Sequence, residues 1–140
     1  MKLLLSTFIF LMLAACGADR DKPSSDRGFS QEQLALGKQV FETHCQECHG
    51  AGAAGVVRDW HKPLPDGSMP APPLNGSAHA WHHSDEALLR TVNTGGIPLG
   101  GTMPPFRDVL DEGQKTAVLA YIKSLWPDEL YAAWKERYSP

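Results

Sequence analysis

Two cysteines and a histidine stand close together in the run Cys45-Gln46-Glu47-Cys48-His49. This C-x-x-C-H pattern is the attachment signature of c-type haem. Two thiols at this spacing lie on one turn of chain, from which they add to the two vinyl groups of the ring. The histidine that follows then lies under the iron, where its imidazole coordinates the metal. The pattern therefore predicts one covalent haem c, carried by Cys45 and Cys48, with His49 as an iron ligand.

Three other uses of the cysteine pair compete with haem attachment. A structural zinc site needs about four ligands, and the sequence has no second cysteine pair. A thioredoxin-like redox pair belongs in a βαβ context, which the helical pattern described below does not provide. A disulfide between Cys45 and Cys48 remains open, but it would leave the long loops of the chain without an organising element. We therefore favour haem attachment.

The third cysteine lies behind an apolar segment. Met1-Lys2 and the apolar residues 3–13 resemble a secretory signal peptide, and as a helix the segment is too short to span a membrane. Small residues then precede Cys16, as in a bacterial lipobox. We expect a signal peptide over residues 1–15, a lipid anchor at Cys16 and a disordered polar tether over 16–28. The folded domain would cover residues 29–140.

The composition is that of one ordinary globular domain. The chain has 140 residues, of which 42% are hydrophobic and 21% charged. Three cysteines allow at most one bridge, which excludes a disulfide-rich scaffold. The 16 acidic residues exceed the 13 Lys and Arg residues, and the net charge of −3 argues against a nucleic-acid partner.

Apolar spacing and capping residues predict helices and no strands. Ser30 is a favourable N-cap, and Leu34, Gly37 and Phe41 follow it at intervals of three and four residues. Gly37 costs helix stability, so we expect it to let another helix approach closely. The predicted helices cover residues 31–44, 84–95, 111–126 and 128–137, and the third of these is the expected partner of the first.

Two stretches rich in glycine and proline, residues 50–83 and 95–110, separate the predicted helices. They are too long to be idle connections in a domain of this size. We expect a bound group, rather than regular structure, to organise them. Trp126 and Trp134 are expected to serve core packing or the cover that the C-terminal extension provides.

With this motif and this helix pattern, the chain resembles the class I cytochrome c family over nearly all of residues 29–140. The resemblance implies an all-α cytochrome c fold, with three to four helices and long loops around one covalently bound haem. It also implies that Gly37 and Phe41 meet the region of Tyr121, where the first and last helices of the family cross. The methionine loop of the family resembles the segment around Met103.

The P-x-L element of the family matches Pro72-Pro73-Leu74. By this resemblance the Pro72 carbonyl accepts a hydrogen bond from Nδ1 of His49, and Leu74 packs on the haem ring. Such a bond fixes the tautomer of the histidine and directs its other nitrogen towards the iron.

Met103 is the favoured second axial ligand. Met69 and Met103 are the only methionines beyond the signal peptide, and Met69 lies before the P-x-L element, on the expected proximal side. Ligation by a second histidine is the alternative, and it would lower the reduction potential. The candidates, which also form a candidate accessory copper or zinc site, are His79, His82 and His83. Candidate donors to the haem propionates are Arg58, Trp60, His61 and Lys62.

With both axial positions filled, no site remains for a substrate. We therefore expect a one-electron carrier rather than an enzyme. It would pass electrons between redox protein partners in the bacterial cell envelope, on the periplasmic side, with Cys16 anchoring it to a membrane. The alternatives are the electron-accepting cytochrome subunit of a periplasmic dehydrogenase and a haem lipoprotein with an accessory metal site at the three histidines.

Overall fold

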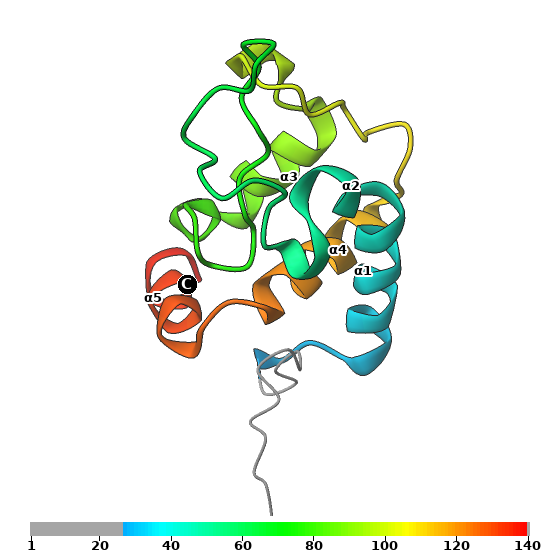
Figure 1. The fold of residues 1–140 in the computed structure, drawn as a ribbon. Helices are drawn as coiled ribbons and strands as arrows, with labels where there is room; N and C mark the ends of the chain where they lie inside the picture. The colour runs from blue at the N-terminus through cyan, green and yellow to red at the C-terminus, as the bar shows by residue number, and fades with distance from the viewer. Residues whose placement is uncertain (1–26, 140) are drawn as a thin grey trace, which may run out of the picture.

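The computed structural model describes residues 27–139 of the 140. Within them the chain is helical and contains no strand, as expected. The α-helices are α1 (Gln31–His44), α2 (Gln46–His49), α3 (Asp85–Thr94), α4 (Glu112–Ser124) and α5 (Asp128–Tyr138), and the short 3-10 helices are η2 (Ala51–Ala53), η3 (Ala80–His82) and η4 (Ile97–Leu99). In Figure 1, α1 crosses α4 and the chain between α2 and α3 forms a long loop above them.

The predicted helices are present and their number is corrected. We expected three to four, and the described residues contain five α-helices, because the C-x-x-C-H run itself folds into the short α2. Capping explains the starts of the longer helices. The hydroxyls of Ser30 and Ser84 accept from the backbone at Gln33 and Ala87, and Asp111 forms a complete capping box with Gln114.

The crossing of α1 and α4 depends on a glycine, whose lack of a side chain lets the two helices approach closely. A Cβ at Gly37 would lie 2.0 Å from the Ala117 carbonyl oxygen and 2.8 Å from Cβ of Tyr121. One turn further, the rings of Phe41 and Tyr121 lie 5.5 Å apart. Both predictions for this crossing, the close approach at Gly37 and the contact between Phe41 and the Tyr121 region, are confirmed.

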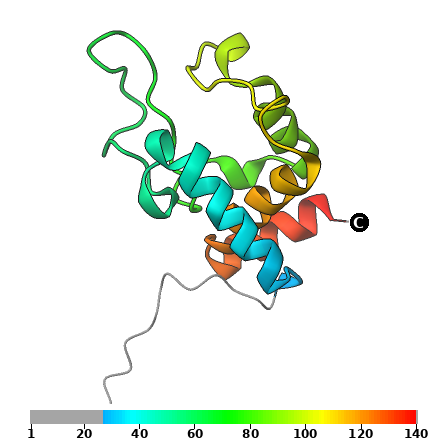
Figure 2. The same ribbon diagram turned by 90° about the vertical axis from the view of Figure 1, so that its right-hand side faces the viewer.

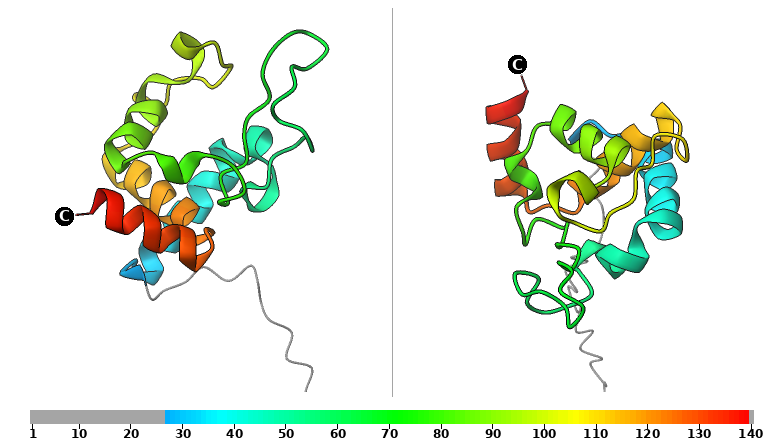
Figure 3. Two further views of the ribbon diagram at one scale, coloured as in Figure 1. Left: turned by 90° about the vertical axis from the view of Figure 1, so that its left-hand side faces the viewer. Right: turned by 90° about the horizontal axis from the view of Figure 1, so that it is seen from above.

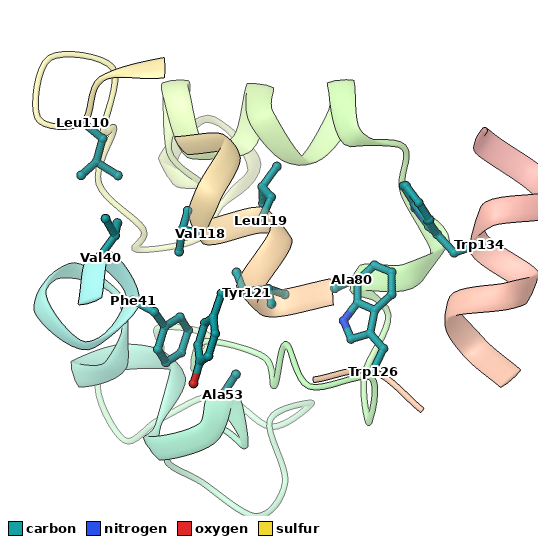
Figure 4. Packing of buried hydrophobic residues seen from close by; sticks show 11 residues of the cluster. Val40, Phe41, Ala53, Ala80, Leu110, Val118, Leu119, Tyr121, Trp126 and Trp134 are labelled. Atoms are coloured by element: carbon teal, nitrogen blue, oxygen red, sulfur yellow. The ribbon is translucent and has the colours of Figure 1, made fainter. Parts of the chain in front are cut away.

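The core spreads outward from this crossing. Phe41 has no exposed surface, and Val118 and Trp126 are almost completely buried. Figure 4 shows Phe41 and Tyr121 side by side at one end of the cluster and the two tryptophans at the other. Trp126 and Trp134 meet edge to face, with ring centroids 6.0 Å apart, so the expectation that they serve packing and cover is confirmed.

Polar contacts hold α3 and α5 to this core. No residue of α3 is fully buried, although Leu88, Leu89 and Val92 pack against the core. Nζ of the buried Lys123 donates to both carboxylate oxygens of Asp85 at 2.8 Å and lies 4.3 Å from the ring centroid of Trp134. One buried cation on α4 thus joins the start of α3 to α5.

The two glycine- and proline-rich loops extend from the same side of the helices (Figures 2 and 3). The predicted signal peptide, Cys16 and most of the predicted tether lie outside the described residues. No helix among residues 27–139 is long and apolar enough to cross a membrane.

Candidate functional site

The motif cysteines lie where α1 passes into α2. The backbone N–H of Cys45 still donates to the Phe41 carbonyl of α1, at 2.9 Å, and its carbonyl accepts from the N–H of His49, also at 2.9 Å. Cys45 is half-buried and Cys48 is exposed, and both are free thiols. The alternative of a Cys45–Cys48 disulfide therefore does not apply to the structure.

His49 is the most constrained residue of the motif. Its side chain is buried, with 8% of the residue exposed, and Nδ1 lies 2.9 Å from the Pro72 carbonyl oxygen. Since a carbonyl only accepts, Nδ1 carries the proton and Nε2 keeps its lone pair. Burial lowers the pKa of His49, and the bond to Pro72 acts in the opposite direction. The predicted hydrogen bond is present, and the lowered pKa favours the neutral imidazole, the form in which a histidine binds a metal.

A tight turn brings the chain back over the motif helix. Gly50 and Gly55 both have φ in the left-handed half of conformational space, at +77° and +82°. A Cβ at Gly50 would lie 2.2 Å from the Gly55 carbonyl oxygen, and the Gly55 N–H donates to the His49 carbonyl at 2.7 Å. No role was predicted for these glycines from the sequence, although their recurrence directly after the motif is typical of a tight turn.

This turn also receives the P-x-L segment. The N–H of Leu74 donates to the Ala53 carbonyl at 2.8 Å, and Pro73 packs on Gly55, where a Cβ would lie 3.1 Å from its Cγ. Leu74 is half-buried against the core. The Pro72 carbonyl that faces His49 is therefore held by contacts on the two residues that follow it.

Met103 lies in a loop closed by backbone hydrogen bonds. Its carbonyl accepts from the Gly96 N–H at 2.9 Å, and the Gly101 N–H donates back to the Gly96 carbonyl at 3.0 Å. A Cβ at Gly95 would lie 2.5 Å from the Met103 carbonyl oxygen. Met103 is half-buried, whereas Met69 has 39% of its surface exposed on the other long loop. The loop thus gives Met103 a defined position.

The histidines of the accessory metal hypothesis do not converge. Among the described residues no group of three or more His, Cys, Asp or Glu side chains is arranged to hold a metal ion. The ring of His79 lies edge-on to His83, 5.6 Å away, while His82 stacks on Trp81. The structure thus contradicts the three-histidine site, because neighbouring aromatic rings take up these side chains.

The candidate propionate donors lie on an exposed loop. The Trp60 ring lies tilted against the rings of His61 and His79, at centroid distances of 3.8 and 5.3 Å. Lys62 pairs with Asp59 at 3.0 Å, and its side chain is 80% exposed. These residues form a cluster of their own on the long loop between α2 and η3.

The donor set fits a covalently attached haem. Burial, with a contribution from the Cys48 thiol, raises the pKa of Cys45 to about 11, so this sulfur is a protonated thiol at neutral pH. A thiol of this kind adds across a vinyl group. The imidazole of His49 and the thioether of Met103 are of the donor types that bind haem iron.

The chain was compared with known proteins. The family model described as cytochrome c oxidase, cbb3-type, subunit III matches residues 32–122, more than half of the chain. The chain belongs to this cytochrome c family. Its members carry haem c with iron, attached covalently, and transfer electrons, so the expected cofactor, fold class and family are confirmed.

The relatives are cytochromes of several kinds. The cbb3-type cytochrome c oxidase subunit FixP of Sinorhizobium medicae is 31% identical over 101 residues, which cover 68% of this chain and 31% of that protein. The cytochrome bc1 complex cytochrome c subunit of Mycobacterium bovis is 35% identical over 98 residues, which cover 68% of this chain and 29% of that protein. Cytochrome c6 of Tetradesmus obliquus is 32% identical over 89 residues, which cover 64% of this chain and 86% of that protein.

The chain therefore spans less than a third of the length of the two respiratory-complex relatives and matches most of cytochrome c6. No solved structure gives a significant match. The family match ends within α4, so α5 lies beyond it.

Proposed function

We propose that this cytochrome is a membrane-anchored one-electron carrier of the bacterial cell envelope. Cys45 and Cys48 would hold the haem, and His49 and Met103 would bind its iron. The bound haem supplies an iron that alternates between the ferric and ferrous states and so stores one electron. The chain acts by keeping the same two ligands in both states, which leaves no open position for a substrate.

The hydrogen bond between His49 and Pro72 is the observation that carries this proposal. It leaves Nε2 as the nitrogen free for iron and fixes the plane of the ring. Burial keeps the imidazole neutral, and the glycine turn after the motif keeps the Pro72 carbonyl in place.

The anchoring part of the proposal rests on the sequence. A lipid at Cys16 would hold the domain on the periplasmic side of a membrane, with the polar residues that precede Arg27 as the tether. Arg27, the first described residue, donates to the carbonyls of Lys123 and Trp126 at 2.6 Å. Growth with a radiolabelled fatty acid should label the parent protein and leave Cys16→Ser unlabelled. Equal labelling of both would contradict the anchor.

The ligand assignment is tested on the purified ferric protein. Replacement of Met103 by alanine should abolish the charge-transfer band between the methionine sulfur and ferric iron. Met69→Ala is the matched control, because it removes the other thioether of the mature chain and should leave the band intact. Persistence of the band in Met103→Ala, or its loss in Met69→Ala, would contradict the assignment.

A second candidate is supported by the comparisons. Relatives include subunits of a cbb3-type oxidase and of a bc1 complex, so this chain is also a candidate electron-carrying subunit of a larger oxidoreductase. Solubilisation of native membranes in mild detergent separates the two roles. A free carrier elutes at the size of the chain in its micelle, whereas a subunit elutes with an oxidoreductase activity.

A further inference from the structure

Trp126 makes a hydrogen bond that connects the C-terminal part of the chain to the histidine site. It follows α4 directly and is almost completely buried, with 2% of its surface exposed. Its indole Nε1–H donates to the Leu74 carbonyl at 2.8 Å. Residue 126 lies beyond the residues matched by the family, which end at 122.

Both backbone polar groups of Leu74 are thus hydrogen-bonded. Its N–H donates to Ala53, in the turn after the motif, and its carbonyl accepts from Trp126. Two residues earlier, the Pro72 carbonyl faces Nδ1 of His49. Proline restricts φ, and Pro73 allows the residue before it little freedom, so this segment is stiff. A displacement at Leu74 is therefore transmitted to the Pro72 carbonyl.

Close packing fixes the indole itself. Pro127 lies against the chain just after Leu74, where a Cβ at Gly76 would be 2.8 Å from its Cδ. Trp134 of α5 packs edge-on against the ring of Trp126, and its own Nε1–H donates to the His83 carbonyl at 2.8 Å. The two tryptophans thus make equivalent bonds to two backbone carbonyls, but only the carbonyl bonded by Trp126 belongs to the segment that faces His49.

We propose that Trp126 is a positioning residue for the axial histidine: by holding the Leu74 carbonyl, it keeps the Pro72 carbonyl in hydrogen-bonding position for Nδ1 of His49. This inference rests on the proposed role of His49 as an iron ligand. A strong bond from Nδ1–H increases the basicity of Nε2 and so favours ferric iron. Loss of the Trp126 bond therefore weakens the histidine as a donor and raises the reduction potential.

The test compares two matched variants of the matured holoprotein. Trp126→Phe removes the donor to Leu74, and Trp134→Phe removes the equivalent donor to His83. For Trp126→Phe, the equilibrium constant for reduction by a fixed one-electron couple should rise about threefold, which is a positive shift of about 30 mV. Exchange of the His49 Nδ1–H proton with solvent, followed by NMR, should become faster. Trp134→Phe keeps an aromatic ring against Trp126 and removes only the donor to His83, so it should change both quantities much less than Trp126→Phe does.

Equal shifts in the two variants would show a general loosening of the fold and overturn the proposal, as would an unchanged potential in Trp126→Phe. Should the phenylalanine variant not mature, 3-benzothienylalanine at 126 or at 134 keeps both fused rings, lacks the N–H donor and makes the same comparison. Failure of the proposed function gives a different result. In that case the parent protein itself shows no low-spin haem spectrum with histidine ligation.

Discussion

The crossing of α1 and α4 and the two long loops both bring backbone into close contact, but they do so by different means. At the crossing, a single glycine allows contact and large side chains such as Phe41 and Val118 are buried on either side. In the loops, Gly50 and Gly95 lie against backbone carbonyl groups, Gly55 lies against the Pro73 ring, and few apolar side chains are buried. The helices are held by side-chain packing, and the loops by backbone geometry.

This difference indicates how each region depends on the cofactor. The crossing buries its apolar surface within the polypeptide, so its stability is a property of the chain. The loops instead place the Pro72 carbonyl against His49 and hold the Met103 segment through backbone hydrogen bonds, and α3 beside them has no fully buried residue. Substitutions in the crossing should therefore change stability, and substitutions in the loops should change the haem site.

The largest effect is expected for Gly37→Ala. The added Cβ would lie 2.0 Å from the Ala117 carbonyl oxygen, and backbone cannot yield as a flexible side chain does. The free energy of unfolding, measured by chemical denaturation of the holoprotein, should fall by about 3 kcal/mol. Gly113→Ala is the matched control. Its Cβ would meet only the Asp111 side chain, at 3.2 Å, so the change should stay below about 1 kcal/mol. Equal effects would disprove the role of the crossing.

A smaller effect on stability and a larger one on the site are expected for Gly50→Ala. Its φ of +77° is unfavourable for alanine, and the Cβ would lie 2.2 Å from the Gly55 carbonyl oxygen. Stability should fall by about 2 kcal/mol, and the reduction potential should shift as the turn moves away from His49. Gly52→Ala also places alanine at positive φ but has nothing within 4 Å. It should lose about 1 kcal/mol and keep the parent potential; a shifted potential there would contradict this distinction.

The smallest effect is expected for the pH dependence of stability, through His79 and the histidines near it. Burial lowers the pKa of His79, and the nearby His83 and His82 add to the shift. The folded state thus takes up this proton less readily than the unfolded chain, whose histidine pKa is about 6.5. Stability should fall as the pH drops below that value, and His79→Gln should reduce the slope, whereas His44→Gln, outside the cluster, should not. An NMR titration that gave His79 an ordinary or raised pKa would contradict this.

Much of this architecture could be predicted from residues that act locally. Ser30, Ser84 and Asp111 marked helix starts, Gly37 marked the crossing, and the C-x-x-C-H spacing identified the cofactor. Each of these signals depends on residue type and on spacing within a few positions. The bond from His49 to Pro72 spans 23 residues, and it was predictable only because a family resemblance supplied the pairing.

Contacts between distant parts of the chain could not be predicted in this way. The bond between Trp126 and Leu74 spans 52 residues, and that between Lys123 and Asp85 spans 38. Nothing in the local sequence of either partner indicates the other. The alternative of a metal site at the histidine cluster arose from proximity in sequence, but in the fold His79 lies beside Trp60 and His82 stacks on Trp81.

The central claim, that Cys45 and Cys48 carry one haem, is tested most directly by the intact mass of the protein matured in a host that attaches haem. The account predicts the mass of the chain plus one haem for the parent protein, and no added haem when both cysteines are replaced by alanine. A parent protein without haem whose two cysteines form a disulfide would contradict the account. So would haem that stays covalently bound in the double variant.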